Sequence, residues 1–380
     1  MTRLAVVLAG GKGTRLRPLT YSKPKPLIPI AGKPVIDYII EWLRRNGFNK
    51  FIVVAKYLGE QIVEYYKKTN PGDIEVALVD SRDTADAIRL IGDKLTDIDH
   101  FLVSMGDVVC NANFKAFYEF HIEKDGIASI ALKEVDNPLH YGMVVIDQNG
   151  LIKLFVEKPV SMEIYILTMA YNRIFKGIQY ANLVNTGFYM VNNDVLQILR
   201  NNPSLMDWGK HVFPYLIENK YRVYGWIMHP NTYWEDLGRI HNYKKTVWDI
   251  LSCNIHGIRV GNIECHEEEK IEIIRTSDIR GKIIPPVYIG RDVVIEEDCI
   301  IGPYVSIEDD TTIKRGSRIS YSVLWERVVV GENTRIHDSV ITNDVTIGNG
   351  SKIFSSTIGP WTNIPPQTTL QEETYYRPSG

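Results

Sequence analysis

Three glycines and three basic residues share one short stretch near the start of the chain, between Leu8 and Pro18. Glycine lets the backbone approach a ligand closely, and N–H groups exposed in such a loop ahead of a helix attract phosphate oxygens. The basic side chains add positive charge suited to a triphosphate. The stretch therefore predicts a phosphate-binding loop, and its six residues are Gly10, Gly11, Gly13, Lys12, Arg15 and Arg17.

Two common phosphate-binding motifs do not fit this loop. A P-loop requires GxxxxGK[ST], and that string does not occur in the chain. The dinucleotide fingerprint GxGxxG fails as well, because no third glycine follows Gly11 and Gly13 at the required spacing. The loop thus belongs to another class of phosphate site.

A second basic segment follows directly, from Ser22 to Pro29. Its prolines prevent a helix and stiffen the chain. A rigid segment that carries Lys23 and Lys25 would place a fixed cation near phosphates bound by the preceding loop.

The elements that must position these loops alternate between strands and helices over roughly the first 250 residues. Such alternation predicts a mostly parallel sheet covered by helices, with ligands bound where loops leave the carboxyl ends of the strands. The predicted strands are Leu4–Leu8, Phe51–Ala55, Glu75–Val79, Phe101–Met105 and Ala128–Lys133. The predicted helices are Val35–Asn46, Leu58–Lys68, Thr84–Leu95 and Asn113–Lys124.

The last 95 residues or so follow a different period. Isoleucine recurs every six residues from Ile289 to Ile319, and after an interruption near Trp325 the pattern resumes with Val330 and Ile336. Short strands stacked at this period are typical of a parallel β-helix, in which each coil places an aliphatic side chain into a shared core. We expect residues 1–250 to form one domain, 251–286 a connector and 287–370 the β-helix.

Composition and charge restrict the partners. A formal net charge of -3 provides no broad basic surface for nucleic acid. The apolar run Leu4–Ala9 is too short to cross a membrane. The four cysteines are far apart and look like buried, free thiols rather than a disulfide framework. These features predict a cytoplasmic protein that binds neither nucleic acid nor membrane.

Several segments, taken in order, resemble the sugar-1-phosphate nucleotidylyltransferases. The glycine loop with the Lys-Pro-Lys-Pro segment looks like the family's signature, and the β-helix is shared with its mannose-1-phosphate guanylyltransferase and ADP-glucose pyrophosphorylase branches. The other matching segments are Val103–Asp107, Tyr141-Gly142, Val156–Pro159, Asn185–Gly187 and Tyr233–Gly238. The resemblance implies a Rossmann-like α/β domain followed by a left-handed parallel β-helix.

The resemblance also implies the reaction: an NTP and a sugar 1-phosphate give a nucleotide-sugar and pyrophosphate. Catalysis would rest on Arg15, Lys25 and Asp107, with Asp107 and Asp236 holding Mg²⁺, a cation that prefers carboxylate and phosphate oxygens. The residues implied to bind nucleotide are Leu8, Ala9, Gly10, Gly11, Gly13, Thr14, Arg15, Ser81 and Thr84. The residues implied to bind the sugar phosphate are Tyr141, Gly142, Glu157, Lys158, Asn185 and Gly187.

The substrates stay open at this point. The segments from Ser322 to Asn333 resemble the guanylyltransferase branch and favour GTP with mannose 1-phosphate, whereas Thr84–Ala87 is closer to the ADP-glucose branch. Glucose 1-phosphate with ATP, UTP or dTTP is therefore the alternative.

Two other classes compete. A non-catalytic regulatory subunit would be expected to lack a phosphate-binding lysine or a metal-binding aspartate, and the chain retains both. Acyltransferases also use hexad β-helices but work with a histidine there. His337 is the only histidine within these hexads, and we interpret it as a surface residue, which argues against this class. For the enzyme we expect a homo-oligomer, and its assembly through the flat sides of the β-helix is a compatible hypothesis.

Overall fold

The computed structural model describes residues 2–69, 71–138, 141–157, 182–258, 271–273 and 277–377. These residues form two compact units, each made of segments distant in sequence. The first contains residues 1–10, 40–106 and 112–234, and the second contains 11–39, 107–111 and 235–380. Within the described parts, no helix is long and apolar enough to span a membrane.

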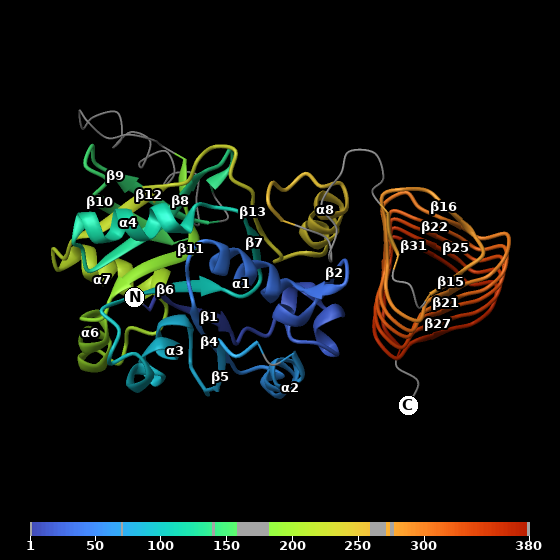
Figure 1. Cartoon of the computed structure of the whole chain (residues 1–380), viewed down its shortest axis with the longest axis horizontal. Helices are drawn as coiled ribbons and strands as arrows, with labels where there is room; N and C mark the ends of the chain where they lie inside the picture. The colour runs from blue at the N-terminus through green and yellow to red at the C-terminus, as the bar shows by residue number, and fades with distance from the viewer. Residues whose placement is uncertain are drawn as a thin grey trace. The chain divides into compact units, whose positions relative to one another are not determined.

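A mixed sheet forms the centre of the first unit (Figure 1). Its parallel part has the order β6-β1-β4-β5, and the remaining strands extend it beyond β6 through the antiparallel strand β11. The strands are β1 Leu4–Ala9, β4 Lys50–Ala55, β5 Ile74–Leu78, β6 His100–Met105, β8 Ala128–Glu134, β9 Gly142–Ile146, β10 Ile152–Glu157, β11 Leu183–Asn192 and β12 Val223–Ile227.

The helices around this sheet largely match the predicted ranges. They are α1 Val35–Arg45, α2 Gly59–Thr69, α3 Thr84–Leu90, α4 Phe114–Lys124, α6 Val195–Asn201 and α7 Phe213–Glu218. The predicted helix over Thr84–Leu95 is too long, because α3 ends at Leu90 and a 3-10 turn follows over Gly92–Lys94. Glycine is a poor helix former, which accounts for the break.

The core of the first unit explains why these segments become strands. Every residue of β1 is buried, and so is the stretch Phe51–Ala55 of β4. Near-continuous aliphatic runs are what a parallel strand covered on both faces requires. The predicted Rossmann-like arrangement is therefore confirmed, with antiparallel strands added on one side.

Three parallel sheets make up the β-helix of the second unit (Figure 1). The first sheet contains β14 Ile271–Ile273, β17 Val287–Ile289, β20 Val305–Ile307, β23 Ser322–Leu324, β26 Val340–Ile341, β29 Thr357–Ile358 and β32 Thr374–Tyr375. The second contains β15 Asp278–Ile279, β18 Val294–Ile295, β21 Thr312–Ile313, β24 Val329–Val330, β27 Thr346–Ile347 and β30 Asn363–Ile364. The third contains β16 Lys282–Ile283, β19 Ile300–Ile301, β22 Arg318–Ser320, β25 Arg335–His337, β28 Lys352–Phe354 and β31 Thr369–Gln371.

The hexad isoleucines fill the core of these coils, as predicted. The interruption near Trp325 is a change of coil length. Ile289 pairs with Ile307, 18 residues on, whereas Ile307 pairs with Leu324, 17 residues on. Leu324 thus occupies the core position of a side that is one residue shorter, and the later coils keep this length.

Outside the β-helix, the second unit contains the glycine loop, the basic segment and a helix, α8, over Ile240–Leu251. Short strands β7 Val108–Cys110 and β13 Trp234–Asp236 pair with each other, and β2 Pro29–Ile30 pairs with β3 Lys33–Pro34. Cys110 and Cys299 are buried thiols outside any disulfide, as expected. Cys253 is disulfide-bonded, so the expectation that no cysteine forms a disulfide is wrong.

Candidate active site

A lysine and two aspartates from three distant segments converge in the second unit. The ammonium nitrogen of Lys25 lies 2.5 Å from Oδ2 of Asp107 and 3.0 Å from Oδ1 of Asp236. Lys25 belongs to a 3-10 turn over Lys25–Leu27 that is framed by prolines, Asp107 lies in the turn between β6 and β7, and Asp236 ends β13. The backbone N–H of Leu237 donates to the carbonyl of Asp107, so both carboxylates are fixed by the same pair of strands.

Burial and charge make Lys25 a permanent cation. Its side chain is almost completely buried, and that burial by itself lowers the pKa of the ammonium group. The two aspartates outweigh this effect, and the net pKa lies above the usual lysine value. Asp107 and Asp236 are more accessible, with side chains 27% and 36% exposed, so a ligand can reach their outer oxygens.

The glycine loop turns sharply at Gly13, which lies in the left-handed region of the backbone. Gly13 has φ of 59°, and a Cβ placed on it would lie 2.7 Å from Thr20 Cγ2, so glycine is required here. The Thr20 hydroxyl donates to the Gly13 carbonyl at 3.0 Å, and the chain then forms a 3-10 turn over Thr14–Leu16. Arg15 on this turn is exposed, as are Gly11 and Thr14. The predicted phosphate-binding residues are thus free to meet a ligand.

Arg15 and the aspartates lie in the same part of this unit. A Cβ added to Gly238 would lie 3.0 Å from Oδ2 of Asp236 and 3.2 Å from an Arg15 guanidinium nitrogen. Gly238 therefore keeps the space between these two side chains open. Three predicted residues, Arg15, Lys25 and Asp107, are brought together with Asp236 in one charged cluster.

The two carboxylates fit a hard divalent cation. Both already face a single positive nitrogen within 3.0 Å, which shows that their oxygens converge on one point. Two carboxylates alone do not complete a site, and among the described residues no group of three or more His, Cys, Asp and Glu side chains could hold a metal. Mg²⁺ typically uses one or two carboxylates together with water and substrate phosphates, so this donor set suits a metal that arrives with a nucleotide.

The first unit contains the remaining predicted nucleotide residues. Leu8 and Ala9 end β1, and the Leu8 carbonyl accepts a hydrogen bond from Gly106 N–H at 2.9 Å. A Cβ on Gly10 would lie 3.3 Å from Lys56 Cβ. Lys56 donates to the Ser81 carbonyl at 2.6 Å, so a side chain at position 10 would crowd the lysine that contacts Ser81.

Thr84 begins α3, and its side chain contacts a residue that no sequence motif indicated. Its hydroxyl donates to Oδ2 of Asp207 at 2.9 Å, and Asp207 also accepts from the backbone N–H of Lys210. Asp83, the N-cap of α3, lies near Asp207, and its pKa is raised by burial and by this second carboxylate. No motif marked Asp207, because it meets α3 only through the fold.

Glu157 ends β10, opposite the start of β9. A Cβ on Gly142 would lie 2.6 Å from Oε2 of Glu157, and a Cβ on Gly209 would lie at the same distance. The carboxylate therefore occupies a space that exists because both positions are glycine. Gly209 was not predicted, and a glycine next to Trp208 was the only signal in the sequence.

Of the other predicted sugar residues, Asn185 and Gly187 lie in β11, and Tyr141 directly precedes β9. The Asn185 amide donates to the Tyr189 hydroxyl at 3.0 Å, and its carbonyl accepts from the backbone N–H of Gly187. The ring of Tyr141 lies 5.3 Å from that of Trp234. Lys158 lies outside the described residues.

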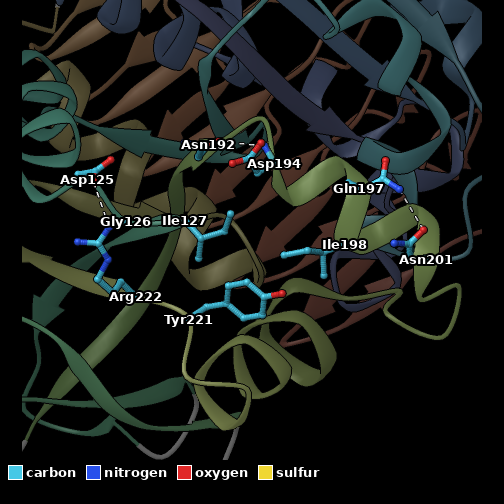
Figure 2. A pocket seen from close by; sticks show the side chains of 10 residues that line it. All are labelled: Asp125, Gly126, Ile127, Asn192, Asp194, Gln197, Ile198, Asn201, Tyr221 and Arg222. Carbon is cyan, nitrogen blue, oxygen red and sulfur yellow. Dashed lines mark hydrogen bonds and ion pairs between the residues drawn. The ribbon is translucent and has the colours of Figure 1, made fainter.

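Figure 2 shows a cavity that contains none of the predicted site residues. It has a volume of about 530 Å³ and lies where the parallel strands β8 and β12 begin, between Asp125–Ile127 and α6. Ligands of open α/β sheets bind at the opposite, carboxyl ends of the parallel strands. Its polar side chains are also paired with one another, as in the contacts of Arg222 with Asp125 and of Gln197 with Asn201. We therefore do not assign the substrates to this cavity.

Comparison with known proteins agrees with this geometry. Residues 4–252 match the model of the nucleotidyl transferase family, and residues 285–375 match the EIF2B subunit epsilon LbH domain. Among curated proteins, a UTP–glucose-1-phosphate uridylyltransferase from Synechocystis is 30% identical over 87% of this chain and 85% of its own length. Mannose-1-phosphate guanylyltransferase 1 from Arabidopsis thaliana is 28% identical over 98% of this chain and 91% of its own. The bifunctional protein GlmU from Methanocaldococcus jannaschii is 31% identical over 86% and 74%.

The matches define the class of this protein. The chain belongs to the nucleotidyl transferase family, among its sugar-1-phosphate nucleotidyltransferases. The C-terminal match agrees with the three-sheet coil, which is the parallel β-helix that the hexads predicted and whose left hand the family resemblance implied.

Proposed function

We propose that this enzyme transfers the nucleotidyl group of GTP to mannose 1-phosphate, forming GDP-mannose and pyrophosphate with Mg²⁺ as cofactor. The observation that carries the proposal is the cluster in which Lys25 contacts both Asp107 and Asp236. A buried cation held by two accessible carboxylates suits a reaction in which two anionic substrates must meet.

Both reactants are negatively charged, so the main task is to bring them together and to stabilise charge in the transition state. The phosphate oxygen of the sugar substrate attacks the α-phosphorus in line with the leaving pyrophosphate. A phosphate monoester is already a competent nucleophile near neutral pH, so no general base is required.

The residues of the second unit have distinct roles in this proposal. Asp107 and Asp236 would hold Mg²⁺, which supplies positive charge to the phosphate oxygens when bound. Lys25 would meet the α-phosphate, and its pKa keeps it charged at working pH. Arg15 and the backbone of Gly11, Gly13 and Thr14 would bind the β- and γ-phosphates.

The residues of the first unit would recognise the sugar and the base. Glu157, Asn185 and the Gly142 backbone offer acceptors and donors for sugar hydroxyls, which occur in adjacent pairs. Ser81 and Thr84 would lie along the nucleoside, and Lys158 would bind the phosphate of the sugar.

The choice of substrates rests on the extent of the similarity. The guanylyltransferase relative from Arabidopsis matches 98% of the chain, whereas the uridylyltransferase relative matches 87%. UTP with glucose 1-phosphate is the second candidate, because that relative has the higher identity. ATP or dTTP with glucose 1-phosphate, and a non-catalytic regulatory role, are further alternatives.

Three related expectations stay predictions. These are the boundaries at residues 250 and 286, assembly into homo-oligomers through the β-helix, and a cytoplasmic location.

The test is a pyrophosphate-release assay with Mg²⁺ that crosses GTP, ATP, UTP, dTTP and CTP with mannose, glucose, galactose and N-acetylglucosamine 1-phosphates. We expect one preferred pair, GTP with mannose 1-phosphate. Preference for UTP and glucose 1-phosphate would replace the substrates but keep the reaction. No release from any pair, by a folded protein, would favour the regulatory role.

A further inference from the structure

One corner of the β-helix differs from the rest of its surface in what it contacts. The strands β20, β23, β26, β29 and β32 stack in register, so the residue after each strand occupies the same corner of successive coils. The residues at this corner are Glu308, Trp325, Thr342, Gly359 and Tyr376. The core positions just before them are mostly isoleucine or leucine, whereas the corner positions are all different.

The corner residues contact the segment that carries Lys25. The Gly32 N–H donates to Oε1 of Glu308 at 3.3 Å. The ring of Tyr376 stacks on that of Tyr21 with centroids 4.6 Å apart. A Cβ on Gly359 would lie 2.4 Å from Tyr376 Cδ2 and 2.9 Å from Pro18 Cβ, so glycine at that coil leaves room for both residues.

Trp325 reaches the same segment through α8. Its indole N–H donates to the Tyr243 hydroxyl at 2.9 Å, and this hydroxyl donates to the Pro29 carbonyl at 2.8 Å. Both aromatic side chains are fully buried. Loss of either one would leave buried polar groups without partners, which is costly.

In two coils, the residue that follows the corner position also contacts the segment that carries Lys25. Glu326 accepts from the Lys23 ammonium at 2.5 Å, and Asn343 Oδ1 accepts from the Ser22 hydroxyl at 2.6 Å. The Lys23–Glu326 pair is largely shielded from water, so salt screens it less than an exposed ion pair. Lys23 and Lys25 are separated only by Pro24, yet their side chains bind carboxylates on different parts of the unit.

We infer that this corner of the β-helix positions the segment 18–32 so that Lys25 meets its two aspartates, with Glu326 and Asn343 as positioning residues. The β-helix is then part of the catalytic apparatus and not only a surface for assembly. Reactive groups lose much of their rate when they are misplaced by a fraction of an ångström to an ångström, so a loosened segment should mainly lower turnover. This inference rests on the proposed function only for its kinetic readout.

The experiment is a double-mutant cycle with Lys23→Met, Glu326→Gln and the double variant. We expect each single variant to lower kcat about tenfold with the KM for GTP nearly unchanged, and the double variant to be no worse than either single one. Asp298→Asn is the matched control, because it breaks an exposed ion pair with Arg315 in the same β-helix and should leave kcat unchanged.

Hydrogen–deuterium exchange of the peptides within 18–32 gives a second readout that does not need turnover. Glu326→Gln should raise exchange there, and so should Ser22→Ala, which removes the hydroxyl that donates to Asn343. Unchanged exchange in 18–32, or additive losses of kcat in the cycle, would overturn the inference. If the wild-type protein releases no pyrophosphate but Glu326→Gln still raises exchange in 18–32, the proposed function is rejected and the positioning role is kept.

Discussion

Glu308 provides a test of the contact between the β-helix and the catalytic segment. It is buried, and it accepts hydrogen bonds from the Gly32 N–H and the Ser306 hydroxyl. Burial, with smaller contributions from Glu326 and Asp309, raises its pKa from 4.5 to about 8, even though the two hydrogen bonds act in the opposite direction. At neutral pH the side chain is therefore a neutral acid.

The sign of the pH effect follows from this shift. The folded protein retains a proton between pH 4.5 and 8 that the unfolded chain releases, so Glu308 contributes less stability as the pH rises through this range. The slope for one group is about 1.4 kcal/mol per pH unit. Glu308→Gln keeps the shape of the side chain and its acceptor oxygen but removes the carboxyl proton that titrates. Between pH 5.5 and 7.5 the variant should gain roughly 2 to 3 kcal/mol relative to the wild type, as an upper bound.

Thermal unfolding of both proteins at pH 5.5, 6.5 and 7.5 measures this gain. We expect the difference in Tm to grow in favour of the variant at each step. Glu297→Gln is the control, since the Glu297 side chain in the same β-helix is 57% exposed and should produce no such trend. A difference that stays constant with pH would refute the assignment of a neutral, buried carboxyl to Glu308.

The remaining predictions concern the active site. Lys25→Met should lower kcat by about a hundredfold or more, because the two aspartates lose the cation that they share; near-normal turnover at saturating Mg²⁺ would contradict the role of Lys25. Asp107→Asn and Asp236→Asn should each raise the Mg²⁺ concentration required for half-maximal turnover while circular dichroism stays native, and unchanged Mg²⁺ titrations would remove them from the metal site. Glu157→Gln should raise the KM for the sugar phosphate more than the KM for the nucleotide, and equal effects would mean that it does not contact the sugar. Lys158→Ala should show the same selectivity, with a larger effect if it binds the phosphate.

The fold could be predicted largely because its aliphatic residues recur in regular patterns. Parallel strands buried on both faces need continuous aliphatic runs, and a β-helix core needs one aliphatic residue per side of each coil. The coil length of 17 residues after Ile307 was not predicted, because the pattern near Trp325 reads as an interruption. Only the register of the strands reveals Leu324 as the core residue of a shorter side. The disulfide of Cys253 was not predicted, because the four cysteines form no CxxC pair or other spacing typical of a disulfide framework.

The candidate site could be predicted in part. The local composition of the glycine loop predicts a phosphate site, and the family resemblance indicated Asp107 and Asp236. Asp207 and Gly209 were missed because their significance comes from neighbours far away in the chain, Thr84 and Glu157 respectively. A short motif contains no information about such neighbours.

The β-helix separates two kinds of sequence information. Positions that face the core repeat, because every coil presents the same buried environment to its neighbours. Positions at the corner after the first-sheet strands do not repeat, and there Glu308, Trp325 and Tyr376 each match a different part of the catalytic segment or its helix. Substitutions in the repeat should therefore cost stability first, whereas substitutions of Glu326 and Asn343, which follow this corner, should lower turnover first. In this β-helix, the departures from the repeat indicate where it acts on the active site.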